Sequence, residues 1–150
     1  MTRYLVVAHE TVTNPELLKQ VRAVREQEEE AEFVLLVPAT SVRHLLFGRG
    51  DERDAEVAAR KLAERARTLF AKRGMPLSDV RVGAPDPVEA IDGEVEVNPG
   101  YAGFIISTLP EEKSRWLRMD LPHSHTVRSK YGLPVHHVVA AQDFTLGDLP

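Results

Sequence analysis

Short, mostly apolar runs alternate with longer amphipathic stretches along this 150-residue chain. The short runs cover residues 4–8, 33–37, 78–82, 104–107 and 135–140. Continuous apolar runs of this length are typical of strands that are buried on both faces, as strands are inside a parallel sheet. The alternation therefore predicts an α/β fold: a doubly wound, five-stranded parallel sheet with helices on both faces.

Four amphipathic stretches connect these runs, and each carries helix signals. Asn14 and Pro15 suit the N-cap and first position of the first helix, and Asp86 suits the N-cap of the third. Gly74 and Gly132 are expected to end the second and fourth helices, the fourth beginning near Asp120. The apolar faces are expected at Leu17, Leu18, Val21 and Val24, then at Ala55, Ala58, Ala59, Leu62, Ala66, Leu69 and Phe70, and in the third helix at Val88, Ile91 and Val95.

Composition limits the classes of protein to which the chain can belong. Its length fits a single domain over residues 1–150, with a core over about 3–140 and a loosely held C-terminal tail. The formal charge of −4 argues against nucleic-acid binding, and the absence of cysteine excludes disulfides, iron–sulfur clusters and thiol catalysis. No apolar run approaches the length that spans a bilayer and no signal peptide is visible, so a cytoplasmic protein is expected.

The sheet order decides where a ligand would bind. Five strands suit the orders 2-1-3-4-5 and 3-2-1-4-5, and ligands of such sheets bind beyond the carboxyl ends of the strands, where the order reverses. For 3-2-1-4-5 this point is flanked by residues 8–14 and 107–120. The candidate lining residues are His9, Thr11, Ser107, Thr108, Lys113, Ser114, Arg115 and Ser124. Lys113 and Arg115 could hold a phosphate or carboxylate, or could pair with nearby surface acids instead.

Motifs for other chemistry are missing. There is no Walker motif, Gly48-Arg49-Gly50 lacks the third glycine of a dinucleotide fingerprint, and no Gly-x-Ser-x-Gly elbow exposes a nucleophile. His123 and His125 would diverge on a helix, and the neighbours His136 and His137 must face opposite sides of a strand. We therefore expect neither catalytic residues nor a metal site.

Several segments together resemble the universal stress protein family. "VVAHET" is similar to its first strand, "VRVGAPDPVEAI" to its Gly-Asp-Pro turn and third helix, and "FIISTLP" with "LPVHHVVA" to its last two strands. The resemblance spans about residues 3–140. It implies the order 3-2-1-4-5 in a small cytoplasmic domain.

The chain departs from this family at the nucleotide site. The ATP-binding members carry Gly-x-x-Gly, nine residues, then Gly-Ser or Gly-Thr, and these positions fall on Thr108, Glu111, Leu121 and Pro122. The family aspartate that contacts adenine falls on His9. The resemblance and these departures together imply a non-catalytic domain with a rebuilt ligand crevice, acting as a stress-related regulatory or small-anion-binding dimer, with no tightly bound ATP and no cofactor. The alternative is a nucleotide- or phosphate-binding protein that uses Lys113, Ser114 and Arg115, with slow ATPase or phosphatase activity.

The fifth strand is expected to form a sheet edge without proline or lysine, and such edges readily pair with another strand. Members of the family commonly dimerise there. We expect a homodimer whose contact strand holds Val135, His136, His137, Val138 and Val139. One of the two histidines would lie near the two-fold axis, so that protonation below about pH 6.5 would weaken the dimer.

Overall fold

The computed structural model describes residues 2–40, 51–109 and 130–140. The strands are β1 (Arg3–Val7), β2 (Glu32–Pro38), β3 (Asp79–Gly83), β4 (Gly103–Thr108) and β5 (Val135–Val139). The helices are α1 (Pro15–Gln27), α2 (Asp51–Lys72) and α3 (Pro87–Val97). All five strands and three helices were predicted, with strand ends shifted by about one residue. Of the fourth expected helix only Lys130 and Tyr131 are described and helical; its start and the C-terminal tail lie outside the described residues.

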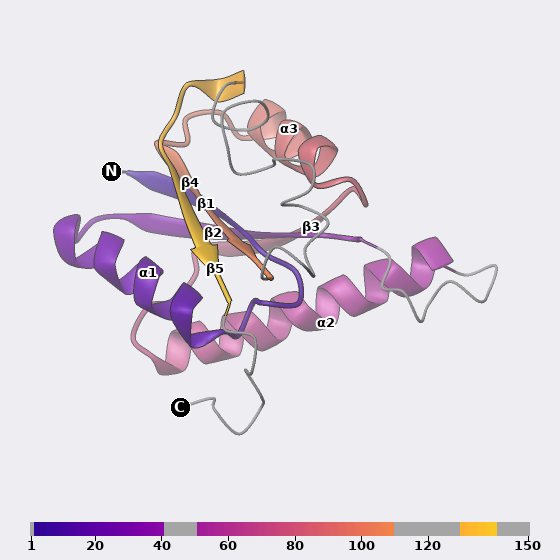
Figure 1. Ribbon diagram of the computed structural model, residues 1–150, viewed down its shortest axis with the longest axis horizontal. Helices are drawn as coiled ribbons and strands as arrows, with labels where there is room; N and C mark the ends of the chain where they lie inside the picture. The colour runs from indigo at the N-terminus through magenta and orange to yellow at the C-terminus, as the bar shows by residue number, and fades with distance from the viewer. Residues whose placement is uncertain (1, 41–50, 110–129, 141–150) are drawn as a thin grey trace.

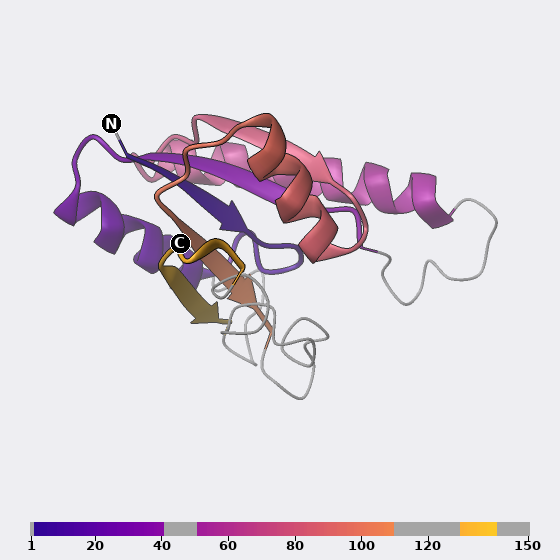
Figure 2. The ribbon, with the colours of Figure 1, turned by 90° about the horizontal axis from the view of Figure 1, so that it is seen from above.

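The strands form one sheet in the order β3-β2-β1-β4-β5, and every neighbouring pair is parallel. This confirms the order 3-2-1-4-5 and rules out 2-1-3-4-5. Figure 1 shows α3 on one side of the sheet and α1 and α2 on the other. In Figure 2, α3 lies in front of the strands and α2 behind them.

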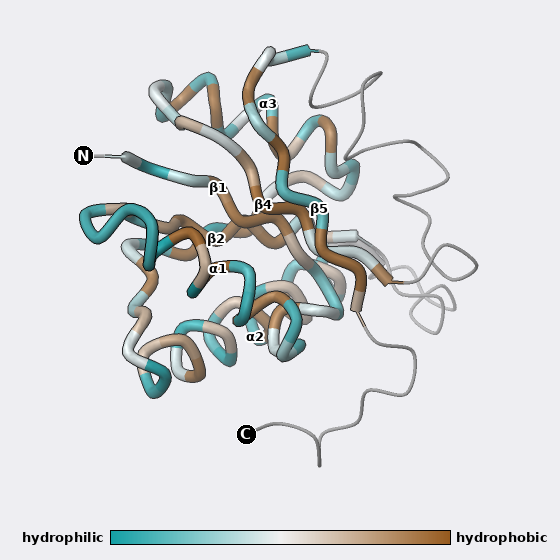
Figure 3. Tube along the Cα trace, turned by 60° about the vertical axis from the view of Figure 1, so that its left-hand side comes forward, coloured by the Kyte–Doolittle hydropathy of each residue, from teal (hydrophilic) through white to brown (hydrophobic). Residues whose placement is uncertain are grey.

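The side chains of each strand divide between two apolar cores. Tyr4, Val6 and Ala8 belong to the core under α1 and α2, whereas Leu5 and Val7 belong to the core under α3. This follows from the two-residue period of a strand. Figure 3 shows hydrophobic strands in the centre and more hydrophilic helices around them.

The edges of the sheet differ from the expectation of strands buried on both faces. Every residue of β3 is half-buried, and in β5 only Val138 is buried. An edge strand has a neighbouring strand on one side only, so more of its surface is exposed to solvent. The expected face of α3 was also partly wrong, because Ala90, Ile91 and Glu94 are buried while Val88 and Val95 are half-buried. The face of α2 includes Ala63 in addition to the residues expected.

The helix ends agree with the sequence signals. The Asn14 side chain accepts a hydrogen bond from the Glu16 N–H, and Asp86 accepts from the N–H groups of Val88 and Glu89. Gly74 and Gly132 have φ angles of 75° and 63°, which glycine adopts without a steric penalty.

β3 and α3 approach each other closely at Gly83. A Cβ atom on this residue would lie 2.7 Å from the Cβ of Ala90 and 3.0 Å from Cδ1 of Leu36. The packing of α3 on the sheet therefore requires that residue 83 have no side chain.

β5 leaves half of its backbone hydrogen-bonding groups unused by β4. The Ala140 N–H donates to the Thr108 carbonyl at 2.8 Å, and the Phe104 N–H donates to the Pro134 carbonyl at 2.9 Å. Because these groups alternate in direction along a strand, the groups of Val135, His137 and Val139 face away from β4. These three residues form the outer edge of β5.

No helix among the described residues is long and apolar enough to cross a membrane.

Candidate functional site

The carboxyl ends of β1 and β4 lie side by side at the point where the strand order reverses. The connection from β1 to α1 runs beside the end of β4 (Figure 1). The hydroxyls of Thr11 and Ser107 are 2.6 Å apart, and the two residues are 5% and 1% exposed. The structure thus brings together two predicted lining residues that are 96 positions apart in sequence. We call His9, Thr11, Asn14, Ser107 and Thr108 the switch-point site.

Two polar side-chain atoms of this site are buried without a hydrogen-bond partner: Nε2 of His9 and Nδ2 of Asn14. Burial lowers the pKa of His9, and the negative charge of Glu10 opposes this effect only in part. His9 is therefore held in its neutral form, in which one ring nitrogen donates a hydrogen bond and the other accepts one. Because leaving a buried polar atom unpaired is costly, a polar ligand that reached these two atoms would be stabilised by bonding to them.

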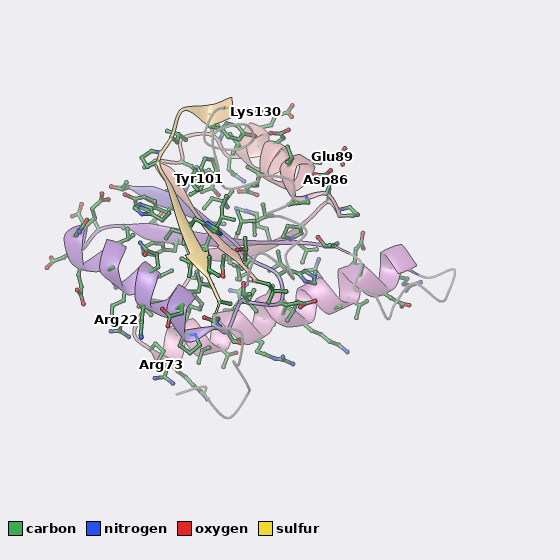
Figure 4. All side chains as sticks on the ribbon, in the orientation of Figure 1. Arg22, Arg73, Asp86, Glu89, Tyr101 and Lys130 are labelled. Atoms are coloured by element: carbon green, nitrogen blue, oxygen red, sulfur yellow. The ribbon has the colours of Figure 1, made fainter. Side chains whose placement is uncertain are left out.

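The described segments that follow β1, β3 and β4 at the carboxyl edge of the sheet carry acidic groups and no basic ones. Glu10 follows β1, and Asp86 and Glu89 lie in the first turn of α3 (Figure 4). The Asp86 carboxylate itself occupies the positive N-terminal end of α3. Neither lysine nor arginine occurs in the described segments 8–14, 83–89 and 107–109. These segments offer hydroxyls, an amide and a neutral imidazole, which suit an uncharged ligand group.

The remaining predicted lining residues, Lys113, Ser114, Arg115 and Ser124, lie outside the described residues. Within the part of the chain that the structure describes, no three histidine, aspartate or glutamate side chains come together as a group that could hold a metal ion. A cavity of about 480 Å³ is present, but its lining comes from α1 and the turn after α2, away from the switch-point site.

Comparison with known proteins gives matches to solved structures and none to family models or curated sequences. No protein-family model matches the chain, and no curated protein matches its sequence. A solved structure of a universal stress protein family protein from Arabidopsis thaliana, with AMP bound, is similar with a TM-score of 0.55. It is 15% identical, and the alignment covers 99% of this chain and 97% of that one. A universal stress protein from Archaeoglobus fulgidus is similar with a TM-score of 0.58 and 15% identity over 92% of this chain and 93% of its own.

This chain has the universal stress protein fold. The sheet order and the resemblance stated from the sequence therefore agree with the structural neighbours on the architecture. At 15% identity the likeness concerns the fold alone. The chemistry of the switch-point site has to be argued from the residues of this chain.

Within this universal stress protein fold, the site has two features that were not predicted from the sequence. His137 was assigned only to the edge of the sheet, but its Nε2 lies 2.8 Å from the Thr108 hydroxyl. Asn14 was identified as a helix cap, but not as a buried amide with an unpartnered nitrogen. Strand alternation could have indicated the first, because it places His137 on the opposite face from the apolar Val138. Nothing in the sequence indicates the second.

Proposed function

We propose that this chain is a non-catalytic, ligand-binding regulatory domain, related to stress responses, that binds a small ligand at the switch-point site and does not bind ATP tightly. The observation that carries the proposal is the set of polar groups at this edge of the sheet: a buried His9 whose lowered pKa keeps it neutral at neutral pH, and hydroxyls that already bond within the protein. The described segments at this edge carry acidic residues and no basic ones. A polyphosphate needs donors and positive charge at this point, and the described residues supply little of either.

The residues that replace the family glycines support weak ATP binding. A glycine loop lets backbone N–H groups approach phosphate with no side chain between them. Thr108 is 2% exposed, and its side chain is engaged with His137. Each charge-assisted hydrogen bond that is lost removes about 1.5–3 kcal/mol. The loss of two or three would weaken a micromolar affinity to about millimolar, at 1.4 kcal/mol per factor of ten.

A second candidate is binding of a nucleotide or phosphate through Lys113, Ser114 and Arg115, with slow ATPase or phosphatase activity. It is favoured by the AMP bound in the Arabidopsis structure that shares this fold. In this chain, the same basic residues would also be the ones to hold a smaller anion.

Calorimetric titration of the protein with Mg-ATP, AMP and inorganic phosphate tests the proposal. We expect a dissociation constant for Mg-ATP no tighter than about millimolar and no release of phosphate from ATP. A micromolar constant would overturn the proposal. If Lys113→Ala or Arg115→Ala then weakens binding while Lys61→Ala on exposed α2 does not, the second candidate is supported instead.

A further inference from the structure

The cavity of about 480 Å³ is a groove between the second half of α1, the turn that follows α1 and the turn that follows α2. Its lining residues are Arg22, Arg25, Glu26, Glu29, Gly74 and Met75. We call it the α1 groove. Because α1 and α2 both run from the carboxyl edge of the sheet to its amino edge, the groove lies at the opposite edge from the switch-point site.

The four charged side chains of the groove form no ion pair with any described residue. Arg22 donates a hydrogen bond from Nη2 to the Arg73 carbonyl at the end of α2, at 3.2 Å (Figure 4). Arg22 and Glu26 are four residues apart, as are Arg25 and Glu29, yet neither pair closes. In the first pair the base precedes the acid, which is the less favourable order on a helix. In the second pair Glu29 lies in the turn after α1, beyond the extended C-cap Glu28, so helical spacing does not bring it to Arg25. The opposite charges are therefore available to an outside partner.

The order of these charges is self-complementary. Two bases at positions 22 and 25 are followed by two acids at positions 26 and 29. A two-fold axis between residues 25 and 26, perpendicular to α1, would set Arg25 against Glu26 of the partner subunit. It would also bring Arg22 to the end of the partner's α1, where the partner's Glu29 lies in the turn that follows the helix. Each contact would occur twice, as a closed two-fold interface requires.

We propose that the α1 groove is a docking surface for a second copy of this chain, with the two α1 helices antiparallel. Two positive and two negative charges leave the groove with no net charge, so a strongly acidic or strongly basic partner gains little there. Gly74 presents no side chain, and a Cβ at that position would have nothing within 4 Å, which leaves room for an approaching helix. The contact uses no residue of β5, so it is independent of pairing at the outer edge of β5. Since exposed ion pairs are individually weak, the association is weak and sensitive to salt.

Charge reversal gives a direct test by sedimentation velocity over a range of concentrations. The measurement is made with Val139→Pro present throughout, because this change removes a backbone N–H from the outer edge of β5 and suppresses pairing there. The acidic variant is Arg22→Glu/Arg25→Glu, and the basic variant is Glu26→Arg/Glu29→Arg. We expect each variant alone to associate about tenfold more weakly or worse than its parent. An equimolar mixture of the two should associate, and the variant with all four changes should recover self-association.

A matched control is Arg60→Glu/Arg65→Glu, which alters net charge as the acidic variant does but on the exposed side of α2. It should have a much smaller effect. The basic variant keeps the bond from Arg22 to Arg73, so it remains informative if the acidic variant loses stability. A parent that stays monomeric at all concentrations, reversals that leave association unchanged, or a mixture that does not associate would each overturn the proposal.

Discussion

Glu94 on α3 is a carboxylate that is only 7% exposed, and three side chains surround its Oε2 atom. The Tyr101 hydroxyl donates to it at 2.7 Å and the Asn98 amide at 3.0 Å. The Arg81 Nε lies 3.0 Å away as an ion pair without hydrogen-bond geometry. Arg3 stacks over the Tyr101 ring, 4.4 Å from its centre. A buried charge persists where it is paired and hydrogen-bonded, as it is here.

Tyr101→Phe should lower the free energy of unfolding by about 1–3 kcal/mol, because it removes one hydrogen bond to a buried carboxylate. Burial and the bond to Glu94 together raise the pKa of Tyr101, so the phenol is the donor at neutral pH. Urea denaturation followed by circular dichroism measures the change. Val97→Ala, at a side chain that is 75% exposed, should stay within about 0.5 kcal/mol. Equal midpoints for Tyr101→Phe and the parent would contradict this account of Glu94.

His9 should make stability depend on pH in a defined direction. Its pKa in the folded protein is below 6.5, mainly because of burial, so below that pH the unfolded chain binds the proton first. The free energy of unfolding should therefore fall as pH drops from 6.5 toward the folded pKa. His9→Gln should reduce this dependence, whereas Glu10→Gln should increase it by lowering the His9 pKa further. Urea titrations between about pH 5 and 7.5 measure it, and an unchanged slope in His9→Gln would refute the assignment.

At the scale of elements, β5 is an edge strand of the sheet and lies beside β4. Its N–H and carbonyl groups that face away from β4 belong to Val135, His137 and Val139, and Val139 is 46% exposed. An edge strand can pair with a strand of another chain. We therefore expect a two-fold homodimer through β5, as the sequence predicts. The histidines lie on opposite faces, His136 beside the Tyr4 ring and His137 beside Thr108.

Val139→Pro should abolish the β5 dimer at micromolar concentration, since it deletes an outward N–H while sparing the ladder to β4. Val139→Thr keeps that N–H and should remain dimeric. Sedimentation at neutral pH separates the two results, and repeating it below about pH 6.5 tests whether protonated histidines weaken the contact. A parent protein that is monomeric at neutral pH would refute the β5 dimer.

At the scale of the whole molecule, the sequence predicted the architecture because strand burial and helix periodicity are local signals. The alternation of strands and helices alone left two sheet orders open. The resemblance to the universal stress protein family favoured the order 3-2-1-4-5, which the structure has. Burial at the edges was overestimated, because an apolar run does not reveal how many neighbours its strand has. Glu94 was missed for a related reason: its partners Arg81 and Tyr101 come from other parts of the chain.

The position of the switch-point site could be predicted from the sequence, but its hydrogen bonds and its unpartnered atoms could not. The rule that ligands bind beyond the carboxyl ends of the strands selected His9, Thr11, Ser107 and Thr108. It could not show that Thr11 bonds to Ser107, because the approach of two side chains depends on the tertiary fold. It also could not show that an Asn14 amide nitrogen is buried without a partner.

The close approach at Gly83 has a consequence for how related chains can vary. A methyl group at residue 83 would meet Ala90 on α3 and Leu36 on β2, so a side chain there requires the helix to move outward. Because the Cα of Ala90 would still lie 3.3 Å away, shortening Ala90 to glycine relieves only part of the overlap. Homologues that keep this helix-to-sheet distance should therefore retain glycine at position 83 and a small residue at position 90. We expect this pair of small residues, seven positions apart across a strand-to-helix turn, to be retained with this packing even in chains whose ligand-binding residues have all changed.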